Sequence, residues 1–236
     1  MTRHFGVLIP PTNTTVEIEC RLLPATYQAH VGRLKSSGAG SFSPSRDEDI
    51  DYQSQLAGTA KVEMVILAQT SASLYADDYD DVVTKRMSAG AGVPAITSAQ
   101  AVGRAVRALG ARRIAIVSPY SEAVNDTRRP LFQDEARARH GRARRIRRDR
   151  RVCDRAARPA ERARRVRPDR SAGDRSLRGA RRQFPDDAVD RRLGAGVQKP
   201  VVTTNQASIW AMLRAFDSAD RLPAFGRLLA EVPPDA

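Results

Sequence analysis

The sequence predicts an α/β fold of two pseudo-symmetric lobes, each with a parallel sheet and flanking helices, and three observations support this prediction. Short, continuous apolar runs alternate with helical patterns, which is typical of parallel strands covered by helices on both faces. A strand–turn–helix pattern occurs twice, 106 residues apart. The chain of 236 residues is long enough to bury one large core or two small ones.

Four apolar runs in the first half of the chain are the predicted strands, and each precedes a polar turn or a helical pattern. They are residues 5–10 (FGVLIP), 61–68 (KVEMVILA), 94–98 (PAITS) and 112–120 (RRIAIVSPY). After the first run, Thr14 and Glu17 have the spacing of a capping box, which predicts a helix that begins near Thr15. Two further helices are predicted over residues 99–111 and 121–135.

The repeat relates residues 92–106 to residues 198–212. Five residues recur at the constant offset: Pro94, Thr97, Gln100, Ala101 and Ala105 correspond to Pro200, Thr203, Gln206, Ala207 and Ala211. We interpret this as a duplication, with a first lobe over residues 1–98, completed by a helix at residues 205–216, and a second lobe over residues 99–204. The alternative is that two strand–turn–helix units resemble each other by chance.

Positive charge is concentrated in one segment. The chain carries a net charge of +13, and residues 137–192 alone hold 22 Arg, no Lys and 8 acidic residues, so the remainder carries −1. Only 6 of these 56 residues are Ile, Leu, Val or Phe. A segment so charged and so poor in apolar side chains cannot bury a core, and we expect disorder from residue 137 to about residue 198.

Two interpretations of this Arg-rich segment remain open. GC-rich genes read out of frame yield mainly Arg, Ala, Gly and Pro, which fits the absence of Lys. Residues 180–197, back-translated with suitable synonymous codons and read one base later, permit a Gly-rich turn and an amphipathic helix. We therefore predict compensating frameshifts near residues 137–142 and 197–199, which would disrupt the second lobe. The alternative is a genuine Arg-rich insertion.

A genuine Arg-rich segment would bind polyanions. Its 22 Arg would release counterions from a nucleic acid and give non-specific, salt-dependent binding through residues 137–192. The segment holds one aromatic residue, Phe184, so stacking on bases is barely available. No zinc-finger, homeodomain or RNA-recognition signature accompanies it. A dedicated Arg-rich nucleic-acid-binding protein is therefore the least favoured function.

Four stretches resemble the aspartate/glutamate racemase superfamily, and within it the branch of the arylmalonate decarboxylases and maleate cis–trans isomerases. They are residues 5–19 (FGVLIPPTNTTVEIE), 65–75 (VILAQTSASLY), 92–125 (GVPAITSAQAVGRAVRALGARRIAIVSPYSEAVN) and 199–216 (KPVVTTNQASIWAMLRAF). The resemblance implies an active site in the cleft between the two lobes. It also implies chemistry beside the carboxylate of a small dicarboxylate or malonate, with no metal and no organic cofactor.

The turn PPTNTT follows the first predicted strand and precedes a helix. The N–H groups of a helix N-terminus attract anions, so Asn13 and Thr14 are candidates to bind a substrate carboxylate. The alternative is that Thr14 only caps the helix. The resemblance favours Asn13 as the substrate contact.

The turn QTSAS follows the second predicted strand, where open α/β sheets bind ligands. The resemblance assigns Thr70 and Ser71 to a hole that stabilises an enediolate, and such donors contribute strongly to catalysis. Tyr120 resembles the cleft tyrosine of the family, and Asn125 is a further substrate-binding candidate. The alternative is a hydroxyl-rich turn without function.

The acid and base that the family uses are missing. Its racemases and isomerases carry one cysteine in each lobe, and its decarboxylases keep the second one. Here the first position is Gln69, which we place among the substrate-binding residues, and the second falls at Ala180, whose codon read one base later cannot encode Cys. The chain therefore resembles a cysteine-less branch.

The remaining cysteines and histidines are not predicted to replace these thiols. Cys20 lies in a predicted helix and is expected to pack, and Cys153 belongs to the Arg-rich segment. The three histidines are expected to be structural or exposed, and no metal-ligand spacing occurs. They are His4, His30 and His140.

Three functions follow, from different classes. The first is a cofactor-independent isomerase, decarboxylase or racemase, inactive as written if the second lobe is disrupted. The second is a non-catalytic carboxylate-binding homologue, and the third is the nucleic-acid-binding protein. No apolar run has membrane-spanning length and the N-terminus lacks a signal-peptide pattern, so we expect a cytoplasmic protein without a membrane partner.

Overall fold

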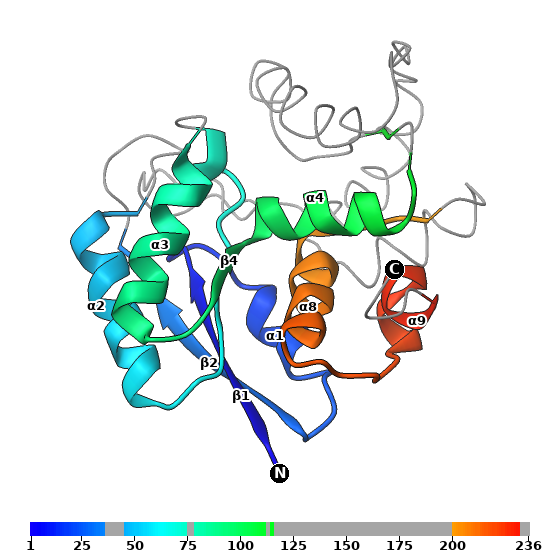
Figure 1. The fold of residues 1–236 in the computed structure, drawn as a ribbon, viewed down its shortest axis with the longest axis horizontal. Helices are drawn as coiled ribbons and strands as arrows, with labels where there is room; N and C mark the ends of the chain where they lie inside the picture. The colour runs from blue at the N-terminus through cyan, green and yellow to red at the C-terminus, as the bar shows by residue number, and fades with distance from the viewer. Residues whose placement is uncertain (36–44, 75–77, 112–113, 116–199, 232–236) are drawn as a thin grey trace, which may run out of the picture.

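The computed structural model describes residues 1–35, 45–74, 78–111, 114–115 and 200–231. These residues form a four-stranded, entirely parallel sheet in the order β2-β1-β3-β4, with helices on both faces (Figure 1). The strands are β1 (Arg3–Ile9), β2 (Tyr27–Arg33), β3 (Val65–Leu67) and β4 (Ala95–Thr97). The predicted α/β class with a parallel sheet is confirmed.

Two helices cover one face of the sheet. They are α2 (Asp47–Thr59) and α3 (Tyr79–Ala91), which enclose Leu8, Val65 and Leu67 from the strands. Their packing requires a glycine, since a Cβ at Gly58 would lie 2.7 Å from the carbonyl oxygen of Ala91. At Gly92 the chain adopts a φ of 71°, a left-handed conformation that ends α3 without strain.

The other face is covered by helices from three separate parts of the chain. These helices are α1 (Val16–Cys20), α4 (Ser98–Ala108), α8 (Thr204–Ala215) and α9 (Arg227–Glu231), and the short turns are η1 (Ala72–Leu74) and η2 (Pro223–Phe225). Phe5 and Val7 of β1 pack in one cluster with Trp210 and Met212 of α8. The core of the first predicted lobe therefore includes a helix encoded near the end of the chain.

The structure reproduces the predicted repeat in its helices. Thr97 accepts a hydrogen bond from the backbone N–H of Gln100 at 3.1 Å, and Thr203 accepts one from that of Gln206 at 3.1 Å. In both copies the glutamine side chain returns a bond to the threonine N–H. The helices α4 and α8 then pack together, and Ser98 Oγ lies 2.9 Å from Ser208 Oγ.

Most predicted elements in the described part of the chain are present, with shifted bounds. The strands predicted at 5–10, 61–68 and 94–98 appear as β1, β3 and β4, and the helices predicted at 99–111 and 205–216 appear as α4 and α8. The strand at 112–120, of which only residues 114–115 are described, and the helix at 121–135 lie outside the described residues. The same holds for the Arg-rich segment, so the division into two lobes stays a prediction.

The elements β2, α2, α3 and α9 and the short turns η1 and η2 were not predicted. The edge strand β2 has the sequence YQAHVGR, whose exposed and half-buried polar residues hide its extended conformation. The helices α2 and α3 bury only narrow stripes, which in α2 are Ile50, Ser54 and Ala57. No helix in the described ranges has the length and apolar character needed to cross a membrane.

Candidate active site

Parallel strands end at the same edge of their sheet, and the candidate residues lie at that edge. The turn of residues 10–15 follows β1, the turn of residues 68–73 follows β3, and β1 and β3 are neighbours with Leu8 opposite Leu67. The structure thus brings five candidates to one edge: Asn13, Thr14, Gln69, Thr70 and Ser71. The candidates Tyr120 and Asn125 lie outside the described residues.

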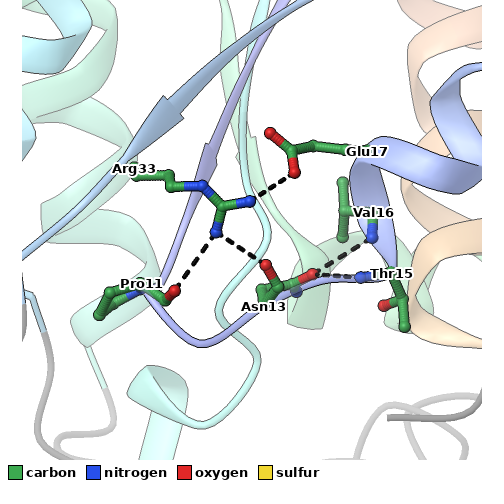
Figure 2. A network of polar contacts seen from close by, with 6 residues as sticks. All are labelled: Pro11, Asn13, Thr15, Val16, Glu17 and Arg33. Atoms are coloured by element: carbon green, nitrogen blue, oxygen red, sulfur yellow. Dashed lines mark hydrogen bonds and ion pairs between the residues drawn. The ribbon is translucent and has the colours of Figure 1, made fainter.

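Asn13 caps α1 with its side chain, as Figure 2 shows. Its Oδ1 accepts hydrogen bonds from the backbone N–H groups of Thr15, at 3.1 Å, and Val16, at 3.2 Å. The predicted capping box of Thr14 and Glu17 is wrong, because the N-cap is Thr15 and it makes no side-chain capping bond. Asn13 reaches both N–H groups at once, a local bonding pattern that short amide side chains favour.

This capping has two consequences for anion binding. The N–H groups of Thr15 and Val16 are occupied and not open to a substrate carboxylate. The amide nitrogen Nδ2 of Asn13 has no hydrogen-bond partner within the described residues, although the side chain is only 8% exposed. Because the carboxamide is planar, the two bonds to Oδ1 also fix the direction of this donor.

A residue that the sequence did not single out holds the same turn. Arg33, the last residue of β2, donates from Nη1 to the carbonyl oxygens of Asn13 at 2.8 Å and of Pro11 at 3.3 Å. Its Nη2 forms an ion pair with the carboxylate of Glu17 (Figure 2). No sequence signal joined Arg33 to this turn, since the contact depends on the unpredicted pairing of β1 with β2.

The turn after β3 has one fixed end and two uncommitted hydroxyl groups. Gln69 is buried, and its Oε1 accepts a hydrogen bond from Ser45 Oγ at 2.9 Å. The hydroxyls of Thr70 and Ser71 are half-buried and make no hydrogen bond to any residue that the structure describes. They are therefore available as donors at the edge of the sheet.

Asp80 of α3 binds a residue of this turn, and the sequence analysis did not single it out. Ser73 Oγ donates to Asp80 Oδ1 at 2.7 Å, and the Thr97 hydroxyl also bonds to this carboxylate. Burial raises the pKa of Asp80, and the bonds from Ser73 and Thr97 oppose that rise. One carboxylate thus connects the turn after β3 to the first residue of the α4 capping box.

Among the residues that the structure describes, the other titratable groups do not form a second centre. Burial raises the pKa of the Cys20 thiol to about 12, with the charges of Glu19 and Glu17 adding to the rise, so the thiol is neutral at physiological pH. His4 Nδ1 lies 2.9 Å from His30 Nε2, and His4 is at the amino end of β1, away from the candidate residues. No group of three or more His, Cys, Asp and Glu in the described ranges is arranged around a metal position.

Comparison with solved structures shows a shared fold. The chain is similar to the maleate isomerase of Pseudomonas putida S16, with 24% identity, a TM-score of 0.69, and coverage of 98% of this chain and 100% of that one. An arylmalonate decarboxylase has 24% identity and a TM-score of 0.63, with 96% and 98% of the two chains covered. The Nocardia farcinica maleate cis–trans isomerase has 20% identity and a TM-score of 0.66, with coverage of 98% and 99%.

Comparison with sequences identifies the family. No curated protein matches the chain. The model of the arylmalonate decarboxylase family matches residues 5–139, and the structural neighbours belong to the branch that the four stretches resembled, so that resemblance is confirmed. Family and fold together support an enzyme of the isomerase or decarboxylase type for small carboxylates. Because the match spans more than half of the sequence, the chain belongs to the arylmalonate decarboxylase family.

Proposed function

We propose that this chain binds a small dicarboxylate at the carboxyl edge of its sheet and acts on a bond beside one carboxylate, without a cofactor. The observation that carries the proposal is a set of donors at one edge. The Asn13 amide, with its oxygen already bound, follows β1, and the uncommitted hydroxyls of Thr70 and Ser71 follow the neighbouring strand β3. Donors that face one edge suit an anionic ligand.

The same donors suit the charge that develops during the reaction. Loss of CO₂ from a malonate breaks a C–C bond and leaves its electron pair as an enediolate on the remaining carboxylate, and removal of an α-proton from the monocarboxylate product gives the same anion. Hydroxyl groups aimed at those oxygens stabilise the anion. Thr70 and Ser71 are the proposed donors, with Tyr120 as a third donor and Asn125 as a further substrate contact. Protonation of the α-carbon then completes a decarboxylation.

Neighbours of similar fold act on ligands of this kind. The maleate isomerase of Pseudomonas putida S16 has been solved with maleate, and the Nocardia farcinica isomerase with a covalently bound succinylcysteine intermediate. In this chain Gln69 replaces the first-lobe thiol, and Cys20 has a pKa of about 12. The proposed mechanism therefore has no covalent cysteine adduct in the first lobe.

A non-catalytic carboxylate-binding homologue is the second candidate. The observation that favours it is the side chain of Gln69, which is 8% exposed and bonded to the buried Ser45. A carboxamide held in this way cannot take up or deliver a proton at a substrate carbon. Such a protein would keep the donors that bind an anion and lack the acid that completes a turnover.

We propose that the Arg-rich segment is the product of a shifted reading frame. The family match ends at residue 139, within the stretch where the sequence predicts the first shift. The chain as written would then lack most of the second lobe and have little activity. A genuine Arg-rich insertion, with non-specific polyanion binding through residues 137–192, is the competing interpretation.

Two measurements test the function. Exchange of the α-proton of a substituted malonate in D₂O separates catalysis from binding alone. Calorimetry of an enediolate mimic tests the site in the frame-corrected chain: Thr70→Ala should weaken binding by about 1–3 kcal/mol, the cost of losing a hydrogen bond to a charged group. The matched control is Thr59→Ala, because the Thr59 hydroxyl bonds only to the Leu56 carbonyl at the exposed end of α2. Equal binding by the parent and Thr70→Ala contradicts the site assignment.

A further inference from the structure

We propose that Arg33 is a positioning residue, which holds the turn after β1 so that the Asn13 amide stays directed at a bound carboxylate, and which neutralises Glu17 beside it. The inference rests on the proposed function, since it names the residue that prepares the same site. Arg33 touches no substrate in this account and acts through Asn13 and Glu17.

The first step is the grip on the main chain. Arg33 ends β2 in register with Ile9, and the backbone N–H of Leu34 donates to the Ile9 carbonyl at 2.8 Å, so the base of the Arg33 side chain is fixed by the sheet. From there Nη1 donates to the carbonyls of Pro11 and Asn13. One guanidinium nitrogen thus joins two carbonyls of the turn that lie two residues apart (Figure 2).

The second step is the orientation of the Asn13 side chain. Its Oδ1 accepts from two N–H groups of α1, and a rotation by 180° would place Nδ2 against those donors. The amide therefore keeps one orientation as long as the turn keeps its place relative to α1. Arg33 holds both partners of this arrangement, the turn through Asn13 and the helix through Glu17.

The third step is electrostatic. Glu17 lies in the first turn of α1, and its carboxylate contacts the guanidinium that also contacts the Asn13 carbonyl. Without Arg33, the negative charge of Glu17 would stand beside the donor of an anion site and repel a dicarboxylate. With Arg33 the ion pair is neutral, and the Asn13 amide presents the positive end of its N–H dipole to the ligand.

The exposure of the pair favours positioning over stability. The side chains of Arg33 and Glu17 are 42% and 35% exposed, and ion pairs of this kind contribute little to folding. A matched pair exists elsewhere: Arg86 of α3 has a side chain 35% exposed and joins Asp51 and Asp47 of α2. Arg86 serves as the control because it makes the same type of contact without holding a turn at the carboxyl edge.

The experiment follows the Asn13 side-chain amide by NMR in the full chain, with malonate and its monoamide as probes. The signal is assigned by its loss in Asn13→Ala. Arg33→Ala should lower the affinity for malonate about tenfold and for the monoamide less, and Arg33→Ala with Glu17→Gln should recover part of the malonate affinity. Arg33→Lys keeps the charge but cannot hold both carbonyls, so its malonate affinity should lie between those of the parent and Arg33→Ala. Arg86→Ala should bind malonate as the parent does.

A second measurement reports on the turn without a ligand. Amide exchange at Thr15 and Val16 should become about tenfold faster in Arg33→Ala, since the Asn13 cap loosens, and should not change in Arg86→Ala. Equal malonate affinity in the parent and in Arg33→Ala overturns the inference while the proposed function stands. So does a loss of affinity in Arg33→Ala that Glu17→Gln does not restore, if the amide exchange of Thr15 and Val16 is also unchanged. If neither the parent nor the frame-corrected chain binds either probe, the proposed function fails, and the exchange rates alone then support or overturn the hold of Arg33 on the turn.

Discussion

The two copies of the repeat share the same helix start, but they differ in the segment that precedes the helix. In the first copy β4 pairs with β3, with Ile66 opposite Ile96, and leads into α4. In the second copy, residues 200–203 lead into α8 and pair with no strand in the described part of the chain. Yet both helices carry the same capping box. A cap needs only residues three positions apart, whereas a strand needs a partner brought from elsewhere in the sequence.

The helices of the two copies also differ in their surroundings. The helix α4 buries one side and exposes Arg104 and Arg107, as expected for a helix on the surface of a sheet. The helix α8 is buried from Asn205 to Leu213, because it packs against α4 and α9 and shares an apolar cluster with β1 (Figure 1). The second copy thus supplies a helix to the core of the first lobe, while its described residues before that helix, 200–203, form no strand.

The largest expected effect comes from restoring the predicted second lobe, which would give residues 200–203 strands to pair with. A gene corrected by single-base shifts near residues 137–142 and 197–199 should yield a chain that unfolds cooperatively and turns over a dicarboxylate. Domain stability is typically about 5–15 kcal/mol, and the loss of most of one lobe's core should exceed it. Calorimetric unfolding and limited trypsin digestion compare the two chains, and the written chain should be cut first between residues 137 and 198. Slow amide exchange of those arginines in the written chain would sink the frameshift interpretation.

A smaller effect separates the two capping boxes. Thr203→Ala removes one cap, which costs about 1 kcal/mol. Thr97→Ala should cost more, because the Thr97 hydroxyl also bonds to the Asp80 carboxylate, which then loses a partner. Urea unfolding of the two variants in the frame-corrected chain measures the difference. Thr59→Ala is the surface control, and equal losses at positions 97 and 203 would show that Asp80 plays no part in the cap.

The smallest expected effect is a pH dependence confined to the first copy. Burial raises the pKa of Asp80 in the folded state above its unfolded value, so the contribution of Asp80 to stability is fully present below the unfolded pKa. It is lost as the pH rises through the folded pKa. The parent should therefore become less stable relative to Asp80→Asn as the pH rises from about 4, and the difference should then level off. Urea unfolding at a series of pH values tests this, and a constant difference would contradict it.

Sequence patterns predicted the elements whose signals are local. The apolar runs of β1, β3 and β4 and the helical patterns of α4 and α8 each lie within a short stretch of sequence, and each was predicted to within a few residues. The edge strand β2 was missed because its conformation depends on pairing with β1 across the chain. The helix α2 was missed because its buried residues are few and one of them is Ser54.

The candidate site divides in the same way. Asn13, Thr70 and Ser71 were predicted from turns that follow apolar runs, and they do lie at the carboxyl edge of the sheet. That the Asn13 oxygen replaces the Thr14 cap could not be predicted, since both residues are common at helix starts and the choice depends on backbone geometry. Arg33 and Asp80 reach the site from β2 and α3, and only the assembled fold brings them there.

The burial of α8 determines when the core of the first lobe can finish folding during synthesis. Arg3 donates to the Phe216 carbonyl at 3.1 Å, so this contact joins two residues that are 213 positions apart in the sequence. While the ribosome is still translating the Arg-rich segment, the face of the sheet that holds Phe5 and Val7 lacks its covering helix and remains exposed to chaperones and proteases. A chain without residues 204–215 would therefore lose the helix that covers this face of the sheet.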